Sequence, residues 1–265
     1  VLASANDLAS DAKHARLLGD EAALFSYLGF CENGQNAHPE LPGDRGVGTF
    51  GGSEDHTAIM SGLAGSLKMF SYCPTKYEGA FAFPTESHVF VIMVSGYVAE
   101  KTGAKMGDYN NAAFLAFDAA RAWVKANAAK SPAVGVADFG FSIFNAATTQ
   151  ECNLAETTRY VRGANPTWSS AEVKASIAAD IATLDSGDGP FPLGKERAYA
   201  AGVLVERFSQ FYDESEVCVP AMAKAFAEMA SAGSGAAAAA TALAAATSDS
   251  HRMTVEELHG TPSHP

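Results

Sequence analysis

The residues best suited to chemistry lie between Gly46 and Met60, in the sequence GVGTFGGSEDHTAIM. Four glycines come first, and Ser53, Glu54, Asp55 and His56 follow them. Glycine admits positive φ and close approach of a ligand, and a helix start offers unpaired N–H groups to an anion such as phosphate. The helix dipole would keep Asp55 ionised in a first turn. This pattern predicts proton abstraction from a substrate hydroxyl or electrostatic positioning of it; the alternative is a glycine-rich turn without chemistry.

The element that follows this segment must hold its polar groups in place. Ser53 is of a residue type that commonly caps the start of a helix. Ile59, Leu63 and Leu67 recur every four residues, which predicts a helix with an apolar stripe.

Two further candidates lie outside this segment. Glu32 follows two helices predicted within residues 1–29, and its carboxylate could bind magnesium (Mg2+) opposite a phosphate or could simply be a solvated helix end. Tyr109 lies after His88–Ser95, a continuous apolar run that predicts a strand buried on both faces. A polar loop joins the two, and such loops commonly form binding sites. The Tyr109 hydroxyl therefore either binds a ligand or lies at the edge of the core.

Length and composition indicate a globular chain. Its 265 residues suffice for one large or two modest domains, and 48% of them are hydrophobic while 18% are charged. A net charge of −12 argues against nucleic acid or an anionic membrane surface as a partner. No apolar run approaches the ~20 residues that span a bilayer. The four cysteines have no metal-binding spacing and predict reduced thiols in a cytoplasmic protein.

Strands and helices are expected to alternate irregularly along the chain. Leu67–Cys73 alternates like a strand, residues 112–130 and 175–184 have helical patterns, residues 197–229 predict two helices, and the alanine-rich stretch 232–247 predicts another. This order predicts an α+β fold rather than a doubly wound parallel sheet.

The stretch GTFGGSEDHTAI resembles the catalytic segment of galactokinase-type GHMP sugar kinases, where an aspartate at a helix start follows a glycine loop by three residues. The resemblance implies ATP-dependent phosphorylation of the anomeric hydroxyl of galactose or a related sugar. It makes Asp55 the catalytic residue and Glu32 the Mg2+ ligand. The substrate-binding residues that it implies are Gly51, Gly52, Ser53, Asp55 and Tyr109. The family usually has methionine before the aspartate and glutamine after it, whereas this chain has Glu54 and His56.

The resemblance is close over residues 44–112 and looser over 1–34 and 200–260. It implies a two-lobed GHMP-kinase-like α+β fold, with 1–86 in the N-terminal domain, 87–265 in the C-terminal domain and the site in the cleft between them. The family's N-terminal sugar-contacting segment, Ser-rich phosphate loop and final Gly-rich loop have no counterpart in this sequence. We therefore expect a fragment that is inactive alone, from a protein whose partners are a small sugar and ATP.

Three alternatives stay open at this level. The chain could be a non-catalytic galactokinase-like sugar sensor, a GHMP kinase for another small molecule such as a mevalonate-like alcohol, or an acidic α/β protein without chemistry. The intact Gly-Gly loop with Asp55 favours a kinase, and the match at Tyr109 favours a sugar.

Overall fold

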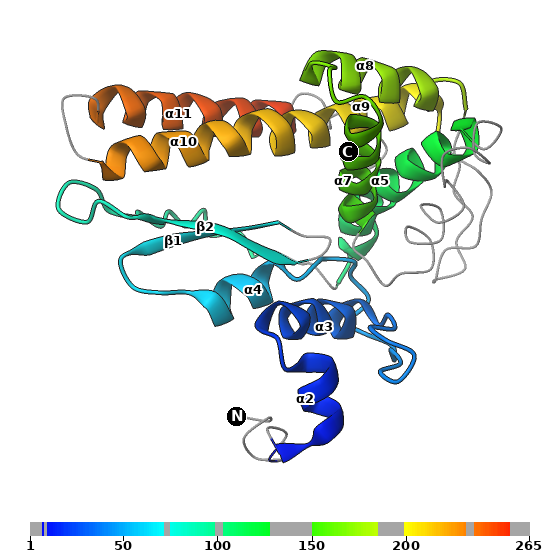
Figure 1. The fold of residues 1–265 in the computed structure, drawn as a ribbon, viewed down its shortest axis with the longest axis horizontal. Helices are drawn as coiled ribbons and strands as arrows, with labels where there is room; N and C mark the ends of the chain where they lie inside the picture. Colours follow the sequence, from blue (N-terminus) through cyan, green and yellow to red (C-terminus); the bar gives the residue numbers. More distant parts are fainter. Residues whose placement is uncertain are drawn as a thin grey trace.

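The computed structural model describes residues 7, 10–71, 75–98, 103–127, 150–184, 199–231 and 236–254. Within these ranges the protein is a mixed α/β molecule that is mostly helical, with a single two-stranded sheet (Figure 1). The elements in chain order are α2 (Ala12–Leu18), α3 (Glu21–Asn33), α4 (Glu54–Ser61), β1 (Ser66–Ser71), β2 (Lys76–Ala82), α5 (Met106–Asn127), α7 (Gln150–Ala164), α8 (Ser170–Ile181), α9 (Ala201–Asp213), the π-helical turn η3 (Glu214–Cys218), α10 (Val219–Ala230) and α11 (Ala236–Arg252). The expected mixture of helices and strands is thus confirmed, and the boundary at residue 86 stays a prediction.

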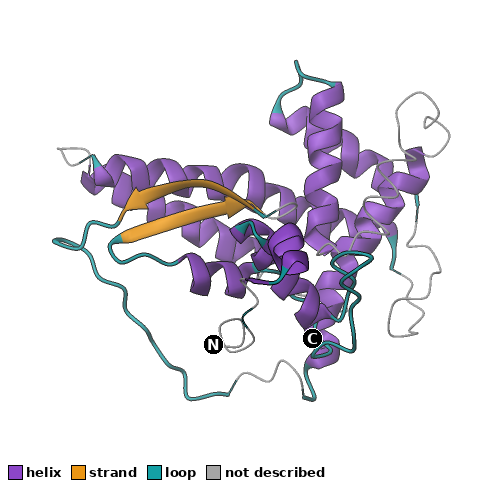
Figure 2. Ribbon diagram, turned by 60° about the horizontal axis from the view of Figure 1, so that its bottom comes forward, coloured by secondary structure: helices purple, strands orange, loops and turns teal. Residues whose placement is uncertain are grey.

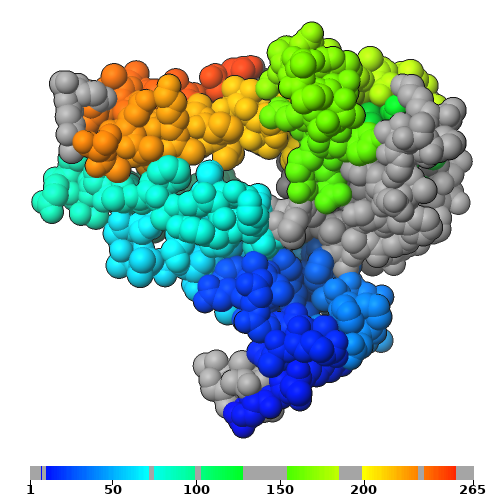
Figure 3. Space-filling view, viewed as in Figure 1, coloured from blue at the N-terminus to red at the C-terminus, as the bar shows by residue number. Residues whose placement is uncertain are grey.

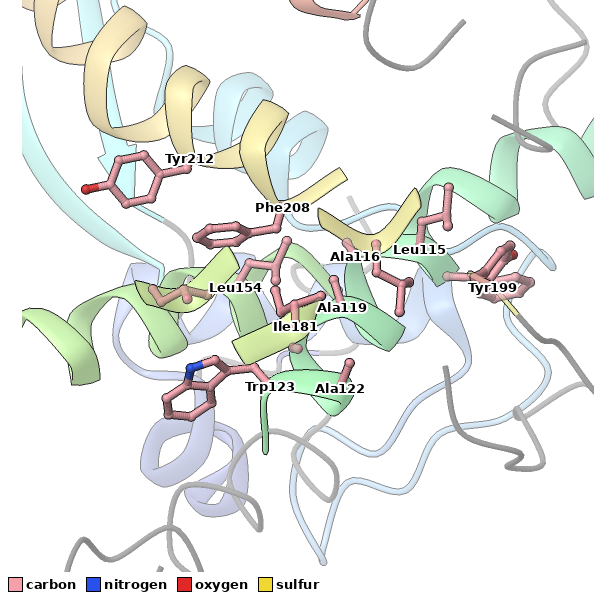
Figure 4. Packing of buried hydrophobic residues seen from close by; sticks show 14 of the residues in the cluster. Leu115, Ala116, Ala119, Ala122, Trp123, Leu154, Ile181, Tyr199, Phe208 and Tyr212 are labelled. Atoms are coloured by element: carbon pink, nitrogen blue, oxygen red, sulfur yellow. The ribbon is translucent and has the colours of Figure 1, made fainter. Parts of the chain in front are cut away.

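The hydrophobic core lies among α5, α7, α8 and α9. Figure 4 shows Leu115 and Trp123 of α5 together with Leu154 of α7, Ile181 of α8 and Phe208 of α9, all of them at most 2% exposed. Each such side chain contributes about 1.5–3 kcal/mol by leaving water. The core therefore fixes α5 firmly, and the first turns of α5 extend beyond it towards the glycine-rich segment.

The sequence predicted these helices well. The helix expected over 112–130, with its start near Asp108, is α5, which begins at Met106; residues 128–130 lie outside the described ranges. The pattern over 175–184 belongs to α8, which begins at Ser170 because Ser169 and Glu172 form a reciprocal capping box. The two helices expected over 197–229 are α9 and α10, and the alanine-rich stretch forms α11 from residue 236 onward, where the structure describes it.

The hairpin of β1 and β2 is antiparallel, and it lies along α10, with α11 packed on the side of α10 away from the strands (Figure 1). The rings of Phe81 and Phe226 join β2 to α10, with 6.4 Å between their centroids. The strand expected over Leu67–Cys73 is confirmed as far as Ser71, and the next residues lie outside the described ranges. In Figure 3 the N-terminal helices protrude from the rest of the molecule. None of the helices described is long and apolar enough to cross a bilayer.

The strand predicted over His88–Ser95 is wrong. Residues 83–98 form a long loop that leaves the hairpin and runs apart from the helices (Figure 2). The exposed fractions of Val89 through Val94 range from 71% to 90%. An apolar run measures how favourable burial would be, but burial also needs elements that cover both faces. Among the described residues no strand pairs with this run and no helix covers it.

Candidate functional site

The glycine-rich segment lies against the C-terminal end of α3. Asp20 caps the start of α3 by accepting from Ala23 N at 3.1 Å, and Gly34 ends the helix with φ +68°, so Glu32 falls in its last turn. The carbonyl oxygen of Glu32 then accepts from Val47 N at 2.9 Å. These local signals fix the backbone of Glu32 beside the glycine segment.

Two glycines of the segment face α3 directly. Gly46 has φ +62°, and a β-carbon on it would lie 2.4 Å from the Glu32 carbonyl oxygen. Gly51 accepts through its carbonyl oxygen from Asn33 Nδ2 at 3.3 Å. The segment can therefore approach α3 closely because Gly46 has no side chain.

The opposite side of the segment is held by the start of α5. The side chain of Asn110, only 2% exposed, accepts from Phe50 N at 2.9 Å and donates to the Gly48 carbonyl oxygen at 2.8 Å. The sulfur of Met106 lies 3.0 Å from the position of a β-carbon on Gly48. These contacts bring α5, and with it Tyr109, to the glycine segment.

Ser53 occupies the predicted N-cap position of α4, but its side chain makes no capping hydrogen bond. Its hydroxyl instead lies 3.0 Å from the hydroxyl of Thr75, which also accepts from Ser26 Oγ at 2.9 Å. Behind it, a β-carbon on Gly29 would lie 2.9 Å from Ser53 N and 3.1 Å from the Gly52 carbonyl carbon. Gly52 and Ser53 are thereby pressed against α3, which orients the start of α4.

The apolar stripe predicted for this helix is wrong. Ile59 and Leu63 are 81% and 63% exposed, α4 ends at Ser61, and Leu67 belongs to β1. The buried positions of α4 are Thr57 and Ser61. The side chains that this helix buries are therefore small hydroxyl ones, whereas Ile59 remains in solvent.

Groups from several parts of the sequence come together around Glu32 and Gly51. Oε1 of Glu32 and the hydroxyl of Tyr109 lie 3.4 and 3.7 Å from the position that a β-carbon on Gly51 would take. Oε2 of Glu32 lies 3.0 Å from Nε2 of His56. We call Glu32, Gly51, His56 and Tyr109 the Gly51 cluster. Its carboxylate and imidazole are 27% and 29% exposed, so a ligand can reach them while water is partly excluded.

Asp55 lies in the first turn of α4, as predicted, and is exposed. In the described part of the chain no hydrogen bond or ion pair joins its carboxylate to another residue. Of the predicted site residues, the structure thus brings Glu32, Gly51 and Tyr109 together. Asp55 lies next in sequence to His56 of the cluster, but within the described residues its carboxylate makes no hydrogen bond or ion pair with the cluster.

Two residues of this region were not predicted as site residues. His56 was noted only as a departure at the flank of Asp55, and Asn110 was not singled out. No spacing signal could assign His56 to Glu32, because the contact depends on how α3 and α4 cross. Asn110 could have been suspected from its place beside Tyr109 at a helix start, since buried asparagines commonly bind loop backbone.

The donor set of the cluster limits what metal it could hold. No group of three or more His, Cys, Asp or Glu side chains suited to a metal occurs among the residues described. One oxygen of Glu32 already accepts from His56, and the other faces Gly51. Such a carboxylate fits Mg2+ that takes its remaining ligands from phosphates and water, and does not fit a metal held by protein alone.

Comparison with known proteins finds no relative of this chain. No protein-family model matches the chain, and neither the curated proteins nor the solved structures contain a match. The function must therefore be argued from the chemistry of the Gly51 cluster and of Asp55.

Proposed function

We propose that this chain carries the sugar-binding and phosphoryl-transfer residues of a galactokinase-type sugar kinase. The observation that carries the proposal is the convergence of two side chains on Gly51: Oε1 of Glu32 and the hydroxyl of Tyr109 lie 3.4 and 3.7 Å from the point that a β-carbon on Gly51 would take. A glycine flanked by a carboxylate and a phenol offers a ligand close backbone approach, one acceptor and one hydroxyl. A polyhydroxyl compound such as galactose matches these groups.

In this proposal the residues divide the chemistry among them. Tyr109 hydrogen-bonds the sugar, and Asp55 orients or deprotonates the anomeric hydroxyl that attacks ATP. The backbone from Gly51 to Ser53 lies beside the sugar and the γ-phosphate. Glu32 would hold Mg2+, which neutralises phosphate charge when it is bound. Catalysis then rests mainly on positioning and charge stabilisation, as is general for phosphoryl transfer.

The proposal extends to the architecture. We infer a two-lobed GHMP-kinase-like fold whose lobes meet near residue 86. Glu32 and the glycine segment precede that boundary, whereas Tyr109 follows it, so the cluster draws on both sides of the proposed division. This arrangement is the one expected of a site in a cleft between two lobes.

A second function is favoured by one observation. Among the residues described, the Asp55 side chain makes no hydrogen bond or ion pair with the Gly51 cluster. A protein that binds the sugar through Tyr109 and Glu32 without transferring phosphate, as a sugar sensor would, needs no such contact. The two functions differ in whether ADP appears, not in whether sugar binds.

Calorimetry and ADP release together test both functions. Galactose would be titrated into the protein with and without MgATP, and ADP would be followed by a coupled assay on the protein that the whole gene encodes. Tyr109→Phe should weaken galactose binding about two- to tenfold, the worth of one hydrogen bond. Asp55→Asn should leave binding in place and reduce ADP release by about 10²–10⁴-fold, the usual contribution of a general base.

Two control variants match these changes away from the site. Tyr97→Phe removes a hydroxyl from a tyrosine that is 91% exposed, and Asp249→Asn removes the same charge from α11. Both should behave as the parent. Binding without ADP release would favour the sensor, and absence of galactose binding in the parent would refute both proposals.

A further inference from the structure

We propose that His56 is a positioning residue for Glu32: it fixes one carboxylate oxygen so that the other is directed at Gly51. The consequence for ligands rests on the proposed function, in which Glu32 serves Mg2+ bound to a nucleotide. The positioning itself rests only on the geometry of α3 and α4.

The two oxygens of Glu32 have different surroundings. Oε2 lies 3.0 Å from His56 Nε2, and because a carboxylate only accepts, the imidazole donates this hydrogen bond. Oε1 lies 3.4 Å from the position of a β-carbon on Gly51, on the side where the Tyr109 hydroxyl also lies. The hydrogen bond therefore occupies one oxygen and leaves the other facing the cluster.

A glutamate needs such a partner if it is to act at a fixed place. Its side chain has three rotatable bonds, and immobilising it costs about 1.5–2 kcal/mol of rotamer freedom. The terminal carboxylate torsion of a glutamate is also broad, so the backbone alone cannot orient the two oxygens. One hydrogen bond from a fixed donor supplies this orientation before any ligand arrives.

His56 is a suitable donor because its own helix is fixed on both sides. The residue after it, Thr57, is 1% exposed and packs into the molecule. Ser53, the N-cap residue of α4, is hydrogen-bonded to Thr75 through their hydroxyls at 3.0 Å. The imidazole is 29% exposed, so it is neither free in solvent nor fully enclosed.

The test compares His56→Gln, whose amide can still donate, with His56→Leu, which cannot. The first readout needs no ligand: the side-chain carboxyl ¹³C signal of Glu32, assigned by its absence in Glu32→Gln. We expect the signal to move in His56→Leu and to stay close to its parent position in His56→Gln. His251→Leu on α11 is the matched control for loss of an exposed histidine, and circular dichroism verifies that each variant folds.

The second readout uses Mn2+ with ADP as the probe and follows paramagnetic broadening of the Glu32 carboxyl signal. Loss of a residue that orients a metal ligand typically costs 10–100-fold in affinity, so His56→Leu should need at least about tenfold more Mn2+. His56→Gln should remain within about twofold of the parent.

The two readouts fail separately. An unmoved Glu32 carboxyl signal in His56→Leu would overturn the positioning role, whatever the metal does. If Mn2+ with ADP leaves Glu32 of the parent unaffected, the metal role in the proposed function is refuted, while the ligand-free signal still decides whether His56 positions Glu32.

Discussion

A substitution of Gly51 by alanine tests ligand binding at the glycine segment without disturbing its fold. The new β-carbon would lie 3.4 Å from Glu32 Oε1 and 3.7 Å from the Tyr109 hydroxyl, which are ordinary contact distances. Gly51 does not have a positive φ, so alanine fits its backbone. Folding should therefore be unharmed, and the loss of chain freedom in the unfolded state should stabilise the protein by about 0.4–1 kcal/mol.

The same methyl group would occupy the space between the carboxylate and the phenol. An extra methyl group in a fitted site typically costs about 1–3 kcal/mol, which corresponds to roughly a five- to 150-fold weaker binding of galactose. Gly51→Ala should thus bind galactose at least fivefold more weakly while unfolding at the same urea concentration as the parent or a slightly higher one.

Gly46→Ala is the matched substitution in the same segment, and it should lower the stability of the fold. Here φ is +62° and the β-carbon would lie 2.4 Å from backbone atoms of α3. The left-handed conformation costs about 1–2 kcal/mol for alanine and overpacking about 1–3 kcal/mol more, so the free energy of unfolding should fall by roughly 2–5 kcal/mol. Urea unfolding and calorimetry would be run on both variants. Unchanged galactose binding in Gly51→Ala would refute the assignment of the Gly51 cluster as the ligand site.

Three further changes test other parts of the structure. Ser169→Ala removes the cap of α8 and should lower the free energy of unfolding by about 1 kcal/mol in urea titrations. Hydrogen bonds from the backbone N–H and then the hydroxyl of Ser169 lower the pKa of Glu172, so this stabilisation is complete above the ordinary carboxyl pKa. The part of it that comes from the hydrogen bond of the Ser169 hydroxyl to the ionised Glu172 is lost as pH falls through the lowered pKa, so the gap between parent and Ser169→Ala should narrow in acid; a constant gap would contradict this. Asn110→Ala removes the buried hydrogen bond from Phe50 N and the hydrogen bond to the Gly48 carbonyl oxygen, which should cost about 1–3 kcal/mol and weaken galactose binding, and unaltered unfolding would count against its anchoring role. Leu204→Ala should cost about 2–5 kcal/mol in the core yet leave galactose binding as it is, once measured below its lowered melting temperature.

The parts of the fold that depend on local signals could be predicted from the sequence. The helices α5 and α8 to α11 follow from spacing and caps near each helix, and β1 follows from alternation. The place of Asp55 in a first turn follows from Ser53 and the glycines before it. In each case the interactions that decide the structure lie within a few residues in sequence.

The parts that failed depend on partners far away in sequence. Burial of His88–Ser95 required neighbouring strands, and no local pattern reports whether they exist. The buried face of α4 depends on how the helix packs in the molecule, and it carries Thr57 and Ser61 in place of the expected stripe of Ile59 and Leu63. The pairing of His56 with Glu32 likewise depends on how α3 and α4 cross. Propensity and periodicity cannot supply such information, because it resides in tertiary packing.

The exposed loop after the hairpin should make self-association of the protein depend on salt. Residues 89–98 carry no charged side chain, whereas the whole chain has a net charge of −12. Electrostatic repulsion between two negatively charged molecules opposes contact between their exposed loops. An uncharged, apolar segment of this kind is prone to pair as a strand with another copy when that repulsion is weak. The reach of that repulsion shrinks from about 10 Å at 0.1 M salt to about 3 Å at 1 M. Repulsion between molecules of this protein should therefore weaken as salt rises. The salt used to elute the protein from an anion exchanger should itself promote self-association.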